Sequence, residues 1–286
     1  MRLVSFNIQY GIGLDGNFDI ARIADAVRGA DVIALQEVTR NFERNGDADL
    51  PGLLSALLPD HYHAFGPGSV TDAGSGMVEG RVRMRLAEFG NMILSRHPIR
   101  AVRNLLLPRS RTYDRLNLQR SALECVIDAP GGAIRFYSVH LDHRSPAERV
   151  AQIAFLKERL TGYVHEGGAV TGGSEFGLGA VPDSGDYVVM GDFNMMPEQP
   201  EYIAMAGPRD LYYGRTASAA FPTDALDRLG RRAEGDFTWE EPGKPDMRQY
   251  LDYCFVSANL ACRLADGWID AGCIASDHKP VWVELS

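Results

Sequence analysis

Apolar and polar positions along the chain form short strand-like runs separated by amphipathic or polar stretches. Two of these runs, 119–128 and 133–140, flank Ala-Pro-Gly-Gly and so predict a β-hairpin. The run at 31–37, Asp-Val-Ile-Ala-Leu-Gln-Glu, is apolar enough for a strand that is covered on both faces. Further runs predict strands at 2–7, 61–65, 91–95, 186–191, 251–256 and 280–285.

Three segments between these strands predict helices. Asp19 precedes apolar residues at helical spacing and predicts an N-cap. Pro51 predicts the start of a short helix that runs to Leu58. Ser145 and Glu148 form a capping box, with proline at the first helical position, and predict a helix that continues to about residue 160.

The segment 167–185 contains seven glycines and shows no hydrophobic period. It predicts a surface loop or a mobile insertion, with a lid over a site as the alternative. No internal repeat and no linker-like break divides the chain. We therefore expect residues 1–286 to form one α/β domain.

The composition is that of a soluble globular protein, with 45% hydrophobic and 23% charged residues among 286. It excludes low-complexity and disordered classes. No apolar run approaches the ~20 residues that a membrane span requires, and we recognise no secretion signal. Four cysteines lie scattered without CxxC spacing, which predicts buried thiols in a reducing cytoplasm and neither a disulfide framework nor a zinc site.

The formal net charge of −9 is informative about partners. Proteins that bind duplex DNA without sequence preference usually carry a basic face, so the acidity lowers the expectation of such binding. A net negative charge is still compatible with a local basic groove. The acidity also suits a site built from carboxylates around a hard cation.

One glycine motif resembles a dinucleotide-binding turn. Gly11, Gly13 and Gly16 match G-x-G-x-x-G after a predicted strand. In a dinucleotide fold this turn runs directly into the helix, whereas here residues 17–19 intervene and Asp19 is the predicted cap. We therefore interpret the motif as a flexible turn.

Polar residues recur at the carboxyl ends of the apolar runs, where α/β proteins place their sites. A single acidic residue in such a position is more often a turn former or a helix cap. Six polar clusters, each closing a strand, exceed what turns alone require. They are Asn7, Gln36–Glu37, His140–His143, Gly191–Asn194, Asp252 and Ser276–His278.

These clusters resemble the successive motifs of the endonuclease/exonuclease/phosphatase superfamily, which includes deoxyribonuclease I, exonuclease III, sphingomyelinases and inositol-5-phosphatases. The matching segments are Ser-Phe-Asn, Leu-Gln-Glu-Val, Ser-Val-His-Leu, Gly-Asp-Phe-Asn, Leu-Asp-Tyr and Ser-Asp-His-Lys-Pro-Val, in family order from residue 5 to 281. The resemblance implies an α/β (α+β) fold, a deoxyribonuclease I-like four-layer sandwich with two central mixed β-sheets. It also implies metal-dependent cleavage of a phosphoester.

The resemblance implies a set of metal ligands. Glu37 would be the principal ligand, with Asn7 beside it and Asp277 nearby or bridged through water. Carboxylates and amides without cysteine or clustered histidine suit Mg²⁺ or Mn²⁺ and argue against zinc. The metal would neutralise phosphoryl oxygens and stabilise the leaving oxygen.

The resemblance also assigns catalytic roles. Asp192 would orient and deprotonate the attacking water, and Asn194 would donate its amide to a phosphoryl oxygen. His278, with His140 on the other side, would stabilise transition-state charge or protonate the leaving group. Asp252 would hold the His278 ring in position.

Several further side chains have two open interpretations. Arg120 could bind the phosphate and Glu88 could orient His140, or both could form plain surface ion pairs. Strand alternation places His143 on the face opposite His140, which disfavours substrate contact. The remaining polar residues are expected to be structural or on the surface: Asn91, His97, His61, His63 and His165.

The sequence also departs from the family pattern. Gln9 stands where the DNA-repair branch has an acid, which weakens the case for a second metal there. The only concentrated positive charge is at 81–85 and 109–115. These stretches are solvated loops or a rim that holds an extra phosphate or an anionic head group.

The sequence thus predicts a phosphodiesterase or phosphatase that acts on a small molecule, a lipid head group or nucleic acid. Its acidity favours a small phosphoester, and a nuclease with the same site is the alternative. A catalytically silent binding module is a third hypothesis. A binuclear metallophosphoesterase is excluded because Asp-x-His and Gly-Asn-His are missing. No obligate protein partner is evident.

Overall fold

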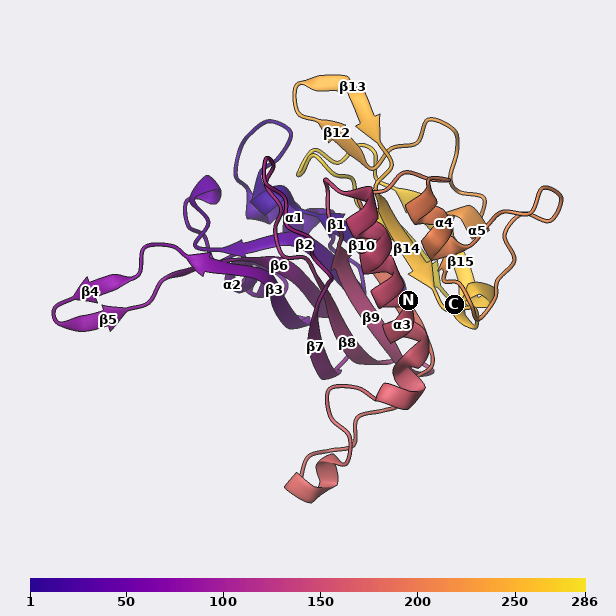
Figure 1. The fold of residues 1–286 in the computed structure, drawn as a ribbon, viewed down its shortest axis with the longest axis horizontal. Helices are drawn as coiled ribbons and strands as arrows, with labels where there is room; N and C mark the ends of the chain where they lie inside the picture. Colours follow the sequence, from indigo (N-terminus) through magenta and orange to yellow (C-terminus); the bar gives the residue numbers. More distant parts are fainter.

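Two six-stranded mixed β-sheets packed face to face form the centre of the computed structural model, which describes residues 1–286 (Figure 1). The first sheet contains, in spatial order, β15 (Leu264–Ile269), β16 (Val281–Leu285), β1 (Arg2–Asn7), β2 (Val32–Arg40), β6 (Leu86–Ser95) and β3 (Tyr62–Asp72). Only β1 and β2 run parallel in this sheet. Their carboxyl ends therefore lie at the same edge.

The second sheet repeats this arrangement. It contains, in spatial order, β11 (Thr223–Asp224), β14 (Asp252–Val256), β10 (Tyr187–Asp192), β9 (Gly132–His140), β8 (Ser121–Ala129) and β7 (Ile99–Leu106). Only β9 and β10 run parallel, and β8 and β9 form the predicted hairpin. Each sheet thus has one parallel pair near its centre.

Helices cover the outer face of each sheet. They are α1 (Ile20–Ala26) and α2 (Leu50–Leu57) on the first sheet, α3 (Pro146–Glu166) and α4 (Pro200–Ala206) on the second, and the short α5 (Ala225–Arg228) beside β14. Apolar side chains fill three layers: one between the sheets and one under each helical layer. This confirms the predicted four-layer α/β sandwich.

Short elements extend from this body. Four are 3₁₀ turns: η1 (Gln9–Gly11), η2 (Glu43–Asn45), η3 (Gly173–Phe176) and η4 (Leu260–Arg263). Two are hairpins: β4 (Gly76–Val78) with β5 (Arg81–Arg83), and β12 (Trp239–Glu241) with β13 (Lys244–Gln249). Figure 1 shows the β4–β5 hairpin as an arm that projects from the body, and the glycine-rich 167–185 segment projecting beyond α3. No helix is long and apolar enough to cross a membrane.

The predicted caps and most predicted strands are confirmed. Asp19 accepts hydrogen bonds from the backbone of α1, and Ser145 accepts one from the Glu148 amide at the start of α3. Helix α3 continues to Glu166, beyond the predicted end. Strands β7 and β15 were not predicted, because both are half-exposed edge strands in which charged residues interrupt the apolar pattern.

The expectation for the cysteines is only partly correct. All four are free thiols, and Cys125 and Cys254 are buried in the layer between the sheets. Cys273 is only partly buried, and Cys262 is exposed because it lies on the surface turn η4.

The glycine at residue 191 permits the close approach of β9 and β10. A Cβ atom there would overlap the carbonyl oxygen of Val139 on the neighbouring strand. We expect Gly191→Ala to lower the free energy of unfolding by about 3 kcal/mol, because the clash is with rigid backbone in a packed sheet. Urea denaturation measures this change.

Gly162→Ala is the matched control, because Gly162 lies within α3 and nothing stands within 4 Å of the added Cβ. It should raise stability by roughly 0.5–1 kcal/mol, since alanine is the better helix former. Equal effects of the two substitutions would contradict the close packing at Gly191.

Candidate active site

The polar clusters predicted from the sequence meet where the carboxyl ends of the two parallel strand pairs face each other. Asn7, at the end of β1, donates its amide to Asp192 Oδ2, at the end of β10, over 3.0 Å. Deeper between the sheets, Gln36 donates to Ser138 Oγ over 2.9 Å. These bonds join residues from both sheets, so the site lies at their junction.

A β-bulge directs Glu37 into this junction. Leu35 pairs with Met92 and Val38 pairs with Gly90, so Gln36 and Glu37 together oppose one residue of β6. Glu37 takes a φ of 59°, which is unusual for a non-glycine residue. Its side chain is only 16% exposed, and its Oε1 lies 4.0 Å from His140 Nε2. Bulges commonly re-aim a side chain beside a site.

Asn91 lies opposite this bulge and has the structural role that was expected. Its amide donates to the carbonyl oxygen of Ser121 over 2.8 Å and so joins β6 to β8.

Asp192 lies at the centre of the site and is almost completely buried. Besides Asn7, His140 Nε2 lies 3.3 Å and His278 Nε2 lies 3.7 Å from its Oδ2. Burial, with the neighbouring carboxylate of Asp252, raises the pKa of Asp192 to about 7, although His278 opposes the rise. A carboxylate with such a pKa can exchange a proton near neutrality.

The two histidines beside Asp192 have different charge states. His278 Nδ1 donates to Asp252 Oδ2 over 2.8 Å. Burial alone would lower the pKa of His278, but the Asp252 and Asp192 carboxylates raise it to about 10. Burial and the Arg120 guanidinium hold the pKa of His140 well below its usual value. His278 is therefore a cation and His140 is neutral.

Arg120 is buried beside these histidines without a carboxylate partner. Its Nη1 lies 3.1 Å from both ring nitrogens of His140, and its Nη2 lies 2.9 Å from His143 Nδ1. The Nε atom is buried and has no hydrogen-bond acceptor. Because buried charges are normally paired, an unpaired guanidinium at the site favours an anionic ligand.

Glu37 and Asp277 offer carboxylate oxygens that could bind a metal ion. Burial and the Asp277 carboxylate both raise the pKa of Glu37. Asp277 Oδ2 accepts from Gln9 Nε2 at 3.0 Å and from Trp239 Nε1 at 3.1 Å, both uncharged donors. Two carboxylates with no cation between them, next to the Asn7 amide, form a donor set that fits a hard divalent cation.

A buried Asp/His cluster nearby could also hold a metal ion. Asp192, Asp252 and His278 offer ligand atoms that all lie within 4.8 Å of one another. The hydrogen bond between His278 Nδ1 and Asp252, however, already uses the histidine nitrogen that faces Asp252. The oxygen donors around Glu37 therefore fit Mg²⁺ or Mn²⁺ better.

Asn194 lies at the site, but its amide already has one protein partner. Its backbone amide donates to Asp192 Oδ1 over 2.9 Å, and its Nδ2 donates to the Leu141 carbonyl over 3.2 Å. Its φ of 50° is tolerated by asparagine. One Nδ2 hydrogen remains for a ligand.

One open alternative is resolved, and two sequence-based expectations are wrong. Glu88 pairs with Arg40 at 2.9 Å, which is the ion pair of its two interpretations. His143 lies on the same side as Arg120, because β9 ends at His140 and strand alternation does not extend past it. In addition, His61 is buried, with its Nε2 3.1 Å from the Ala30 carbonyl, whereas a surface or half-buried position was expected.

Sequence reasoning missed several residues around the site. Gln9 was noted only as a departure from the family pattern, yet it holds Asp277. Trp239 lies in a segment without a recognisable motif and reaches Asp277 from the β12–β13 hairpin. Phe89 packs its ring 6.0 Å from that of His140. The position of Gln9, two residues after Asn7, could have suggested a role at the site. Nothing in the sequence indicates Trp239 or Phe89.

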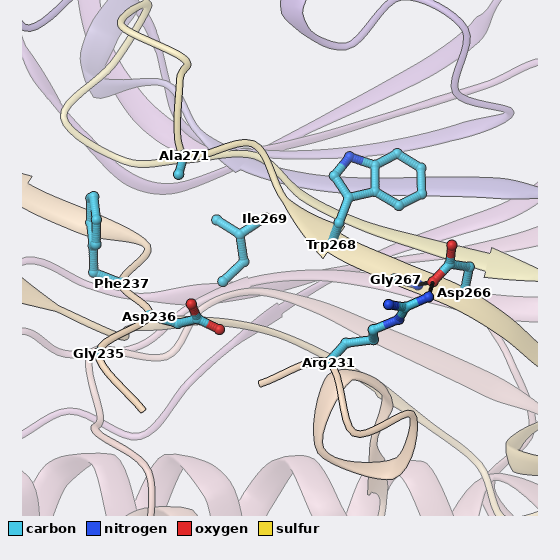
Figure 2. A pocket seen from close by; sticks show the side chains of 9 residues that line it. All are labelled: Arg231, Gly235, Asp236, Phe237, Asp266, Gly267, Trp268, Ile269 and Ala271. Carbon is cyan, nitrogen blue, oxygen red and sulfur yellow. Dashed lines mark hydrogen bonds and ion pairs between the residues drawn. The ribbon is translucent and has the colours of Figure 1, made fainter. Parts of the chain in front are cut away.

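A cavity of about 410 Å³ lies between β15 and the segment before β12. Figure 2 shows Phe237 and Trp268 on opposite sides of it, with Ile269 between them and Arg231 extended toward Asp266. None of the candidate site residues lines this cavity, so it is separate from the cluster around Asp192.

Comparisons with known proteins agree with this geometry. A family model described as the endonuclease/exonuclease/phosphatase family matches residues 4–278. No curated protein matches the chain.

Several solved structures have the same fold at low sequence identity. An endonuclease/exonuclease/phosphatase from Beutenbergia cavernae DSM 12333 is 23% identical, with a TM-score of 0.64 over 100% of this chain and 72% of that one. A mannosyl-6-phosphatase from Bacteroides thetaiotaomicron VPI-5482 is 17% identical, with a TM-score of 0.64 over 100% and 99%. TDP2 from Caenorhabditis elegans is 16% identical, with a TM-score of 0.62 over 99% and 73%.

Asp252→Asn tests the charge state of His278. We expect the pKa of His278 to fall from about 10 toward its ordinary value of 6.5, because the variant lacks the carboxylate that stabilises the imidazolium. An NMR titration of the histidine ring protons in the metal-free protein measures this. Asp266→Asn is the control, since Asp266 pairs with Arg231 outside the site. An unchanged titration of His278 in Asp252→Asn would contradict the assignment.

Proposed function

Because the chain belongs to the endonuclease/exonuclease/phosphatase family, we propose that it is a metal-dependent phosphoesterase in which Asp192 activates the attacking water. The observation that carries this proposal is the convergence on one buried carboxylate of a cationic histidine, a neutral histidine and an asparagine amide. Beside them lies a buried arginine with no anionic partner. This arrangement has both a proton acceptor and positive charge for a phosphoryl group.

In the proposed reaction, Asp192 orients a water molecule and takes its proton while the water oxygen adds in line to phosphorus. A pKa near 7 suits this exchange, since the carboxylate is partly ionised at neutral pH and basic enough to accept a proton. The phosphorus–oxygen bond to the leaving group then breaks. His278, held by Asp252, gives that oxygen a proton.

The remaining side chains bind the phosphoryl oxygens. Arg120 supplies two N–H groups from a buried cation, and Asn194 supplies its second amide hydrogen. His140 Nε2 lies 3.3 Å from Asp192 Oδ2, beside that carboxylate. The preformed positive charge stabilises the charge that develops in the transition state.

Glu37, Asn7 and Asp277 are the proposed metal ligands. Their oxygens suit Mg²⁺ or Mn²⁺, which would supply positive charge to the phosphoryl and leaving oxygens. The bulge at Glu37 and the hydrogen bonds from Gln9 and Trp239 to Asp277 hold the carboxylates in place.

A small phosphoester is the favoured substrate class. The net charge of −9 opposes broad contact with nucleic acid, and one structural neighbour is named a mannosyl-6-phosphatase. Nuclease activity is the second candidate. It is favoured by the exposed residues Arg81 and Arg83 on β5 and Arg111 and Arg115 in the segment before β8, which form no ion pair. Both segments leave the sheets at the edges that carry the site.

Glu37→Gln tests the metal site. With bis(p-nitrophenyl) phosphate and Mn²⁺, we expect kcat/KM to fall by about 100-fold and the Mn²⁺ concentration for half-maximal activity to rise, because a carboxylate ligand is lost. Glu88→Gln is the matched control and should stay within about twofold, since Glu88 pairs with Arg40 away from the site. Equal activity of the two variants would refute Glu37 as a ligand.

Asp192→Ala separates an enzyme from a silent binding module. We expect turnover to fall by at least about 1,000-fold while the affinity for inorganic phosphate changes little, because the base is lost but Arg120 remains. The substrate panel is DNA, RNA, sphingomyelin, inositol phosphates and the chromogenic diester, with Mg²⁺ and Mn²⁺. No turnover by the wild-type protein on any substrate would support the binding module.

The salt dependence of nucleic-acid binding tests the nuclease candidate. For a small-phosphoester enzyme, the logarithm of the DNA-binding constant should fall with the logarithm of salt concentration by a slope of about one or less. Fluorescence anisotropy with a labelled oligonucleotide measures it. A steep slope that Arg111→Ser and Arg115→Ser reduce would favour the nuclease instead.

A further inference from the structure

His143 contacts Arg120 but has no role in the reaction described so far. Its Nδ1 lies 2.9 Å from Arg120 Nη2. A guanidinium can only donate hydrogen bonds, so Nδ1 is the acceptor and the ring proton of the neutral imidazole lies on Nε2. His143 is neutral, because burial and the nearby guanidinium lower its pKa to about 4.

The second contact of Arg120 is of the same kind. Arg120 Nη1 lies 3.1 Å from both ring nitrogens of His140, and because a guanidinium can only donate, a nitrogen of the neutral ring is the acceptor. Both ends of the guanidinium are therefore held by neutral nitrogen acceptors. No carboxylate lies close enough to Arg120 to form an ion pair.

The backbone around His143 is itself fixed. Asp142 is fully buried, and its Oδ1 accepts from the backbone amides of Arg144 and Ser145 at 2.8 and 2.6 Å. Its Oδ2 accepts from Asn117 Nδ2 at 3.1 Å. The turn that follows β9 is thus held from both sides, and it carries the His143 ring back to Arg120.

We propose that His143 is a positioning residue that orients Arg120 toward the phosphoryl group without forming an ion pair with it. A carboxylate in this position would hold the guanidinium equally well but would neutralise it. A neutral acceptor fixes the geometry and keeps the charge for the substrate anion. This inference rests on the proposed role of Arg120 in phosphate binding.

Replacing His143 with asparagine or with aspartate distinguishes the orientation of Arg120 from the neutralisation of its charge. The Oδ1 atom of either residue can stand near the place of His143 Nδ1, and the two side chains differ only in charge. We expect His143→Ala to weaken inorganic phosphate binding by about tenfold, the effect of losing one hydrogen bond to a charged group. His143→Asn should stay within about threefold of the wild-type affinity, and His143→Asp should bind phosphate more weakly than His143→Ala.

Isothermal titration calorimetry with inorganic phosphate measures these affinities, and His165→Asn is the control on an exposed histidine without hydrogen bonds. In an Arg120→Met background, His143→Ala should have no further effect, because its influence passes through Arg120. With the chromogenic diester, the loss in His143→Ala should lie mainly in KM, and His143→Asn should restore it.

Three results would overturn the proposal: unchanged phosphate affinity in His143→Ala, equal affinity in His143→Asn and His143→Asp, or an undiminished effect of His143→Ala in Arg120→Met. If His143→Ala does not fold, the comparison of asparagine with aspartate still decides. The phosphate measurements need no turnover. If the variants show the expected phosphate affinities but the protein hydrolyses no substrate, this inference stands and the proposed function is rejected. If the wild-type protein does not bind phosphate, this inference is rejected.

Discussion

The site depends on one electrostatic constraint, the burial of the Asp192 carboxylate where two β-sheets meet. An ionised carboxylate in an apolar interior is strongly unfavourable unless hydrogen bonds or opposite charge compensate it. Here Asn7 from the first sheet and His278 from the last loop supply that compensation across the junction. The sheets cannot separate or slide without removing it, so packing of the scaffold and electrostatics of the site stabilise the same arrangement.

Four of the eight non-glycine residues with a positive φ lie at or next to this arrangement. Glu37, Asn194, Gln9 and Tyr10 all take positive φ values, and each lies at or next to the candidate site. Such conformations cost free energy and persist only where surrounding structure holds them. The apolar layers above and below each sheet are regular and provide that support. The strained backbone at the strand ends therefore directs polar side chains toward one point. A regular strand would direct these side chains elsewhere.

The sequence was sufficient to predict those features that depend on residues close together in the chain. Apolar runs, caps and the order of polar strand ends led to the four-layer fold and to residues that do converge. It failed where contacts depend on geometry outside a strand. His143 was placed on the wrong face because alternation stops with β9. The partner of Glu88 stayed open because only the register of β2 on β6 brings it to Arg40. Trp239 reaches Asp277 from a hairpin with no recognisable pattern.

The overall acidity of the chain is compatible with buried cations in its site, because surface charges and buried charges act over different ranges. Surface charges are screened by salt beyond about 10 Å, whereas Arg120 and His278 are buried and interact with a bound group at close range. A small anionic ligand that reaches the junction therefore lies close to these cations, as well as to the carboxylates of the site. A long polyanion must also lie along the outer surface, where most arginines are paired with carboxylates; the exposed arginines without an ion pair include Arg81 and Arg83 on β5 and Arg111 and Arg115 before β8. The difference between buried and surface charge thus favours substrates whose phosphate enters the junction over those that lie across it.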